Sequence, residues 1–185
     1  MVNTEKLVIE TERLLLVPIT MQYAEEIFKE FNREITTYMS PKPAKDISET
    51  KAFIQHSIET MNAWTNYQTV ILDKITKEFL GCAWLHADNP KTPELGIWIK
   101  KSAFGKKIGR EAIVGLTDRA QKNLDFEYLF YPVDKDNIPS RKIAESLWWI
   151  LQKDIDGNDI VTNNQTIDPN SEIHWVEYRI PKKQK

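Results

Sequence analysis

The segment 94–147 constrains the fold of this chain most, because strand and helix patterns alternate along it with only short breaks. Residues 94–99 form an apolar run rich in β-branched and aromatic side chains, which predicts a buried strand. A helical pattern follows at about 107–122, a second strand at 127–133 and a second helix at 138–147. Two strands joined through a helix run parallel across a right-handed crossover. We therefore expect a parallel pair of strands here.

The N-terminal half predicts antiparallel strands and two helices. Strand patterns lie at about 7–17, 68–73 and 79–87, and the last two are close enough in sequence to form a hairpin. One helix is expected after Thr20 and another after Asp46, which can cap it. The second helix is expected to bury Phe53, Ile54, Ser57, Ile58 and Met61.

A glycine-bearing basic turn separates the strand at 94–99 from the helix that follows it. The turn carries Gly105 and Gly109, and the helix start directs backbone N–H groups and a positive dipole end toward one point. Such a point suits an anion, and phosphate is the usual one. The turn lacks the Gly-Lys-Ser/Thr ending of a P-loop, and it has two glycines where a dinucleotide fingerprint needs three.

This turn resembles the pyrophosphate loop of the GNAT acetyltransferase superfamily, whose pattern is Gln/Arg-x-x-Gly-x-Gly/Ala. On that pattern Phe104 takes the first position, Lys107 the inner glycine and Gly109 the last position. Gly105 matches the Trp-Gly-Lys-Gly-Tyr-Ala variant of the branch that resembles ribosomal-protein N-terminal acetyltransferases. The resemblance implies that the turn holds the pyrophosphate of acetyl-CoA.

Three other segments resemble the same branch, in the same order along the chain. Residues 9–20 resemble its opening strand, with Val17 in place of an arginine. Residues 128–147 resemble its second signature, a strand followed by Asp/Asn-x-x-Asn-x-x-Ser and a helix. The branch closes that helix with Gly-Phe, where this chain has Trp148-Trp149. Residues 174–180 resemble its closing strand.

The resemblance implies an α/β (α+β) fold of the GNAT type over residues 1–185, as one domain. We expect a mixed, mostly antiparallel sheet of six to seven strands, splayed at a central parallel pair and flanked by about four helices. A length of 185 residues suits one domain. The formal net charge of −2 gives no reason to expect nucleic-acid binding. No apolar run is long enough to span a membrane and no signal peptide is evident, so we expect a cytoplasmic protein.

The resemblance also implies which residues hold acetyl-CoA. Strand backbone at residues 97–99 would pair with the pantetheine arm, residues 104–110 would bind the pyrophosphate, and Asn137 and Ser140 would lie near the arm and the thiol. The alternative for Asn137 and Ser140 is that they simply cap the next helix. The expected cofactor-binding residues are Ile97, Trp98, Ile99, Phe104, Gly105, Lys106, Lys107, Ile108, Gly109, Arg110, Asn137 and Ser140.

Glu94 and Ser140 are the expected catalytic residues. Related enzymes often place an acidic residue at the entry of the strand before the pyrophosphate loop, so Glu94 is the candidate base. A carboxylate acts as a base near neutral pH only if burial raises its pKa, and the alternative is a solvated residue at a strand end. The tyrosine that many members use as proton donor corresponds to Ala144, which leaves that role to Ser140, a water molecule or Tyr131.

The acceptor is expected to be an amine, either a small molecule or a protein N-terminus. Tyr38, Trp64 and Tyr67 fall where this family builds its acceptor pocket, although core packing under a loop explains any one of them better. Protein N-terminus, polyamine, amino acid and antibiotic all remain open. The chain is expected to be a monomer or homodimer. Two other functions remain possible: a CoA-binding module without catalysis, and a binder of nucleotide phosphates.

Metal and thiol chemistry are not expected. The three histidines, His56, His86 and His174, lie far apart in the sequence, which is atypical of metal ligands. Cys82 is the single cysteine, and it lies within an apolar strand where a thiol is normally inert.

Overall fold

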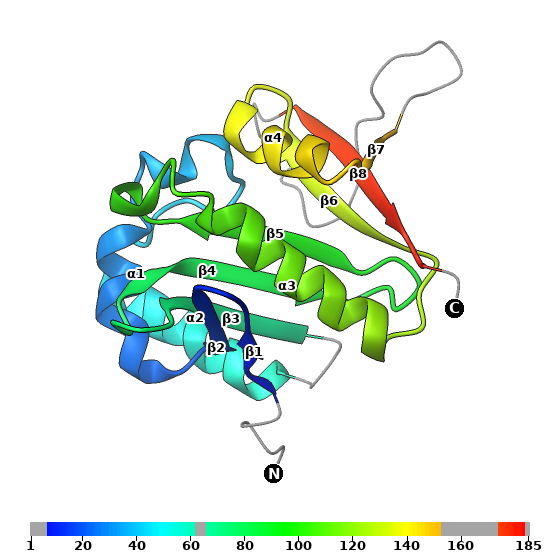
Figure 1. Ribbon diagram of the computed structural model, residues 1–185. Coiled ribbons are helices and arrows are strands. Elements are labelled where there is room, and N and C mark those ends of the chain that lie inside the picture. The colour runs from blue at the N-terminus through cyan, green and yellow to red at the C-terminus, as the bar shows by residue number, and fades with distance from the viewer. Residues whose placement is uncertain (1–6, 62–65, 153–173, 184–185) are drawn as a thin grey trace.

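A computed structural model describes residues 7–61, 66–152 and 174–183 of the chain. Its described residues form eight strands in one sheet, together with four α-helices and short 3₁₀ turns (Figure 1). The strands are β1 (Ile9–Glu10), β2 (Leu14–Pro18), β3 (Asn66–Asp73), β4 (Phe79–His86), β5 (Glu94–Ile99), β6 (Tyr128–Asp134), β7 (Ile150–Leu151) and β8 (Trp175–Pro181). The helices are α1 (Ala24–Glu30), α2 (Ile47–Thr60), α3 (Ile108–Asn123) and α4 (Ile138–Ser146).

The sheet has the order β1-β2-β3-β4-β5-β6-β8-β7, and every neighbouring pair is antiparallel except β5 and β6. These two parallel strands share one ladder position, Glu94 opposite Phe130, beside a hydrogen bond from the Phe130 N–H to the Pro93 carbonyl (2.9 Å). Beyond that point, within the described residues, the strands separate. The expected mixed sheet with a splayed parallel pair is therefore confirmed.

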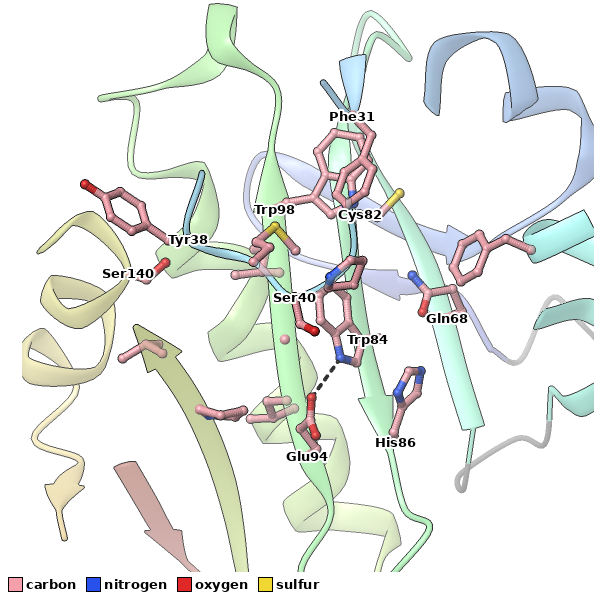
Figure 2. Close-up of a pocket in the computed structure, with 18 of the residues that line it drawn as sticks. Phe31, Tyr38, Ser40, Gln68, Cys82, Trp84, His86, Glu94, Trp98 and Ser140 are labelled. Atoms are coloured by element: carbon pink, nitrogen blue, oxygen red, sulfur yellow. Dashed lines mark hydrogen bonds between the residues drawn. The ribbon is translucent and has the colours of Figure 1, made fainter. Parts of the chain in front are cut away.

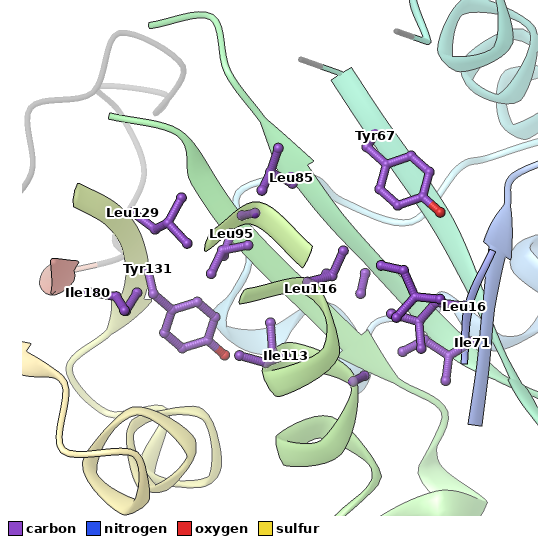
Figure 3. Packing of buried hydrophobic residues seen from close by; sticks show 14 of the residues in the cluster. Leu16, Tyr67, Ile71, Leu85, Leu95, Ile113, Leu116, Leu129, Tyr131 and Ile180 are labelled. Carbon is purple, nitrogen blue, oxygen red and sulfur yellow. The ribbon is translucent and has the colours of Figure 1, made fainter. Parts of the chain in front are cut away.

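Helices cover both faces of the sheet. On one face α3 packs over the strands through Ile113 and Leu116, which join a core that includes Tyr67 and Leu95 (Figure 3). On the other face α1 and α2 contribute Ile27, Ile54 and neighbouring residues to a second core with Trp98 and Cys82. Strand side chains alternate between the faces, so Leu95 and Trp98 of the same strand belong to different cores.

Two sequence predictions differ from the structure. The expected strand at 7–17 is divided into β1 and β2, which pair with each other because the Thr11 hydroxyl accepts a hydrogen bond from the Leu14 N–H and closes a turn. The sheet has eight strands, where six to seven were expected, because the first strand is divided and the two-residue β7 is present. In α2, Ile54 and Ser57 are buried as expected, but Phe53 and Ile58 are 48% and 40% exposed.

No helix among the described residues is long and apolar enough to cross a membrane.

Candidate active site

The basic turn before α3 is held in a backbone conformation that glycine favours. Gly105 has φ of +74° and Lys107 has φ of +61°, both in the left-handed region. Lys107 is also the residue that precedes the first turn of α3. The GNAT pattern has glycine at this position, and glycine adopts positive φ without steric cost. Lys107 therefore replaces the glycine of the pattern but adopts the left-handed backbone conformation that glycine favours.

The N-terminus of α3 has no side-chain cap. The other two long helices are capped: Asp46 accepts a hydrogen bond from the Ser48 N–H at α2, and Asn137 accepts one from the Ser140 N–H at α4. Lys107 makes no such bond at α3. Since the first N–H groups of a helix have no partner within the helix, those of α3 remain available to an anion.

The first turn of α3 lies close to β5 and α4. A Cβ atom added at Gly109 would come within 3.0 Å of the Ile143 side chain and 3.8 Å of the Ile97 side chain. Gly109 therefore allows the helix start to approach the gap between β5 and β6. Arg110 also holds the start of α3 close to α4, because its Nε donates to the Ser146 hydroxyl of α4 at 3.0 Å.

The turn between β1 and β2 is bonded to the basic turn and to α3. Glu111 accepts hydrogen bonds from the Thr11 hydroxyl (2.6 Å), the Arg13 N–H (2.8 Å) and the Arg13 Nε (2.7 Å). Arg13 also donates to the carbonyl of Lys106 at 3.1 Å. Although burial favours protonation of Glu111, these bonds hold its pKa below its usual value. We call these four residues the N-terminal clamp. In this chain, the Thr and Arg of the opening-strand pattern both bind Glu111 of α3.

A pocket of about 470 Å³ begins where β5 and β6 separate and continues over the face of the sheet that carries α1 and α2. Its lining includes Glu94, Asn137 and Ser140, which sequence analysis placed in the site from two separate motifs. It also includes the expected residues Ile97 and Trp98 of β5, and Tyr38. The structure thus brings residues that are up to about a hundred positions apart in the sequence to one concave surface.

The floor of the pocket is built from three strands whose side chains point to the same face. Register places the residues in cross-strand rows about 7 Å apart along the strands. We call them the polar row, the middle row and the apolar row. They are His86–Glu94, Gln68–Trp84–Gly96 and Val70–Cys82–Trp98, respectively.

Gly96 allows the middle row to form. A Cβ atom at this position would lie 2.1 Å from the Trp84 indole, so the glycine lets that ring lie across β5. The indole Nε1 donates to a carboxylate oxygen of Glu94 at 3.4 Å, as Figure 2 shows. Trp84 therefore connects the polar row with the centre of the pocket.

The polar row holds two groups with shifted pKa values. Burial raises the pKa of Glu94, the hydrogen bond from Trp84 partly opposes that shift, and the nearby charge of Asp88 adds to it. Burial lowers the pKa of His86, against the influence of Asp88. A carboxylate whose pKa is raised toward neutrality and an uncharged imidazole are both able to accept a proton. Glu94 is therefore not the solvated strand end of the alternative interpretation.

The turn after β6 positions Asn137 and Ser140. The buried Asp134 carboxylate accepts hydrogen bonds from the N–H groups of Asp136 (2.7 Å) and His174 (3.1 Å), which fixes the turn against β8. Burial raises the pKa of Tyr131 to about 12, and the nearby Ser140 side chain partly opposes that shift. Tyr131 thus stays protonated at neutral pH, and with Ser140 forms a pair of hydroxyls that can donate a proton at the pocket.

Trp148 and Trp149 close α4 in the way that Gly-Phe does in the branch pattern. The Trp148 N–H donates to the Glu145 carbonyl (3.1 Å) and the Trp149 N–H to the Ala144 carbonyl (3.2 Å). This is the Schellman arrangement, and Trp148 occupies its left-handed position with φ of +58°. The Trp149 ring packs edge-on against Tyr131 at 5.5 Å between centroids. The Trp148 side chain is 91% exposed.

Some expected site residues lie elsewhere. Tyr67 is 2% exposed in the core under α3, and its hydroxyl donates to the Leu7 carbonyl, so it faces away from the pocket and cannot contact an acceptor there. Trp64 lies outside the described residues. Ile99 packs toward Gly109. Gly109 lies near the Ile97 wall of the pocket, but none of the expected residues Phe104, Gly105, Lys106, Lys107, Ile108, Gly109 and Arg110 lines the pocket.

Several lining residues were not identified as site residues from the sequence. Gln68, Trp84 and Phe53 carry no motif, and each fits an ordinary strand or helix pattern. His86 was considered only as a metal ligand, and among the described residues no group of three His, Cys, Asp or Glu side chains could hold a metal. The available signal was the glycine in an otherwise apolar strand, Gly96, which marks the close approach of another group.

Comparison with known proteins agrees with this geometry. The family model for the acetyltransferase (GNAT) domain matches residues 13–147. The uncharacterized N-acetyltransferase p20 of Bacillus licheniformis is 28% identical over 141 residues, covering 74% of this chain and 79% of that protein.

Solved structures share the fold. A GNAT-family acetyltransferase from Bacillus anthracis superposes with a TM-score of 0.78 at 15% identity, over 96% of this chain and 99% of that one. An acetyltransferase from Salmonella typhimurium, which modifies the N-terminal serine of a 50S ribosomal subunit protein, gives 0.74 at 17% identity, over 95% and 99%. The match to the family model covers most of the chain, and the chain therefore belongs to the GNAT acetyltransferase family.

Proposed function

We propose that this protein transfers an acetyl group from acetyl-CoA to an amine, by direct attack of the amine in a ternary complex. The observation that carries the proposal is that Glu94, Asn137 and Ser140 share a pocket at the point where β5 and β6 separate. The uncapped N-terminus of α3 lies beside that pocket, across Gly109 and Ile97. A base, a proton donor and an anion site are the groups that this reaction needs.

The residues that would hold acetyl-CoA lie on both sides of the gap. Backbone N–H groups at the start of α3 suit its pyrophosphate, and Lys106, Lys107 and Arg110 supply positive charge there. Within the described residues, the ladder between β5 and β6 ends at Glu94, so the backbone of Ile97–Ile99 on that side can pair with the pantetheine arm. Acetyl-CoA supplies the reactive thioester.

Glu94 and the hydroxyl pair would move the protons. An amine must lose a proton to attack, and Glu94 accepts it because its raised pKa brings it closer to neutral pH. The new C–N bond forms as the C–S bond breaks, the sulfur takes a proton from Ser140, and solvent returns a proton to Ser140. His86, adjacent to Glu94, can relay the proton to solvent.

Calorimetry and thiol release test the proposal together. We expect CoA to bind at least about tenfold more tightly than pantetheine, because pantetheine lacks the charged pyrophosphate that α3 would hold. We also expect acetyl-CoA to release free thiol when a reactive amine is added. Equal binding of ADP and CoA would instead indicate a binder of nucleotide phosphates. CoA binding without thiol release for any amine would indicate a module without catalysis.

The module without catalysis was suggested by the two departures from the pattern, Lys107 and Trp148. Both residues adopt the left-handed backbone that glycine would adopt. The departures therefore leave the shape of the helix start and of the α4 terminus intact, and this supports the catalytic proposal over the silent module.

A further inference from the structure

We infer that the acceptor is a small primary amine whose substituent is apolar and the size of an aromatic ring. This inference rests on the proposed function and concerns the part of the pocket that lies over β3, β4 and β5. The floor of this part is polar at one end, with His86 and Glu94, and apolar at the other, with Cys82 and Trp98. An acceptor that fits both ends must itself be polar at one end and apolar at the other.

The polar row fixes where the amine nitrogen lies. If Glu94 takes the proton, the nitrogen lies within hydrogen-bond reach of its carboxylate. Asp88 and Glu49 also line the pocket, and Lys42 is the one lysine or arginine among its described lining residues. The lining is therefore negative overall, which attracts an ammonium ion.

The floor at the far end of the pocket is apolar. Two rows away, at about 13 Å along the strands, the floor is Cys82 and Trp98, with Phe31 against the Trp98 ring at 5.1 Å between centroids. Burial raises the pKa of the Cys82 thiol, so that end carries no charge. A polyamine would place a second ammonium over this apolar floor, which is costly.

The walls of the pocket leave aromatic surface uncovered. Phe53 of α2 is 48% exposed and Tyr38 is 38% exposed, although both line the pocket. Phe53 lies on the helix face that the sequence pattern assigned to the core. A core-type residue that the fold leaves uncovered at a cavity is where apolar ligand surface is buried. Figure 2 shows the Trp84 indole between the Trp98 end and Glu94, with Tyr38 on the Ser140 side, so an aromatic substituent would contact Trp84 and Phe53.

The test compares amines that share one reactive group and differ in substituent. We expect acetyl transfer to 2-phenylethylamine with kcat/KM at least about tenfold above that for ethylamine, since apolar contacts discriminate by about this factor. We also expect it to exceed the values for spermidine and for a peptide with an N-terminal serine. Thiol release from acetyl-CoA measures all four.

Two variants on α2 identify the surface responsible. Phe53→Ala should lower kcat/KM for 2-phenylethylamine about tenfold, with a smaller loss for ethylamine. Ile58→Ala is the matched control, because Ile58 is exposed on the same helix and does not line the pocket. It should leave both values unchanged.

The outcomes separate the inference from the function on which it rests. Better use of spermidine or of the serine peptide than of 2-phenylethylamine would overturn the inference and leave the acetyltransferase proposal intact. So would equal behaviour of the Phe53→Ala and Ile58→Ala variants. Thiol release with none of the amines, alongside tight CoA binding, would overturn the proposed function and this inference with it.

Discussion

Replacing Trp148 with glycine should stabilise the protein. A non-glycine L-residue in the left-handed conformation costs about 1–2 kcal/mol, and Trp148 has φ of +58°. Its side chain is 91% exposed, so removal of the ring sacrifices little packing. Glycine costs about 0.5–1 kcal/mol through the greater freedom of the unfolded chain. The difference is a net gain of about 1 kcal/mol, equivalent to about 2–4 °C in Tm for a chain of this size.

Urea denaturation of matched variants separates backbone strain from loss of the ring. Trp148→Ala removes the ring but keeps the strained backbone, so its free energy of unfolding should stay about 1 kcal/mol below that of Trp148→Gly. Lys142, exposed within α4, provides the reverse case: Lys142→Gly should be about 1 kcal/mol less stable than Lys142→Ala. If Trp148→Gly is no more stable than Trp148→Ala, the left-handed position carries no strain and the reasoning fails.

Two carboxylates should respond to substitution in opposite ways. Glu94→Gln should lower kcat at least about 10²-fold in thiol-release assays. The same variant should have a higher Tm than the unmodified protein at pH 7, because the raised pKa of Glu94 means that its charge disfavours the fold. The difference in Tm between the two proteins should disappear below pH 4.5, where Glu94 is protonated in both the folded and the unfolded state. Equal Tm values at pH 7 would contradict this account. Glu111→Gln should instead lower the free energy of unfolding by about 2 kcal/mol at pH 7. Because the pKa of Glu111 is lowered, its contribution is present above pH 4.5 and is lost as the pH falls through the folded pKa. Urea titrations at pH 7 and pH 3 measure that loss, and an undiminished gap at pH 3 would argue against the ion pair with Arg13.

The sequence predicted the elements that carry strong local patterns. The bounds 94–99 for β5 match the structure, and the expected limits of α3 and α4 lie within one residue of the observed ones. These segments have clear periodicity and distinct boundary residues, such as the Asn137 cap of α4. The split of the first strand was missed, because its cause is a hydrogen bond of the Thr11 hydroxyl that no periodicity reveals.

Prediction of the site depended on motif residues and failed for residues outside motifs. Glu94 and Ser140 were identified because they occupy spaced patterns, and the structure places both at the pocket. Tyr67 does not line the pocket, because strand alternation decides which face a residue takes, and a shift by one position exchanges the two faces. Phe53 was assigned to the core for a related reason: a helical pattern indicates an inward face but does not reveal that a cavity lies beneath it.

The N-terminal clamp also has a consequence for the order of folding. Arg13 and Glu111 are 98 positions apart, so their bonds form only after the two ends of that long stretch have met. Contacts of such separation carry a large loop-closure cost and tend to form late. The segment around Arg13 thus completes the shape of the basic turn, although the two are far apart in the sequence. Removal of the segment through Arg13 would leave the basic turn and α3 without the bonds of the N-terminal clamp.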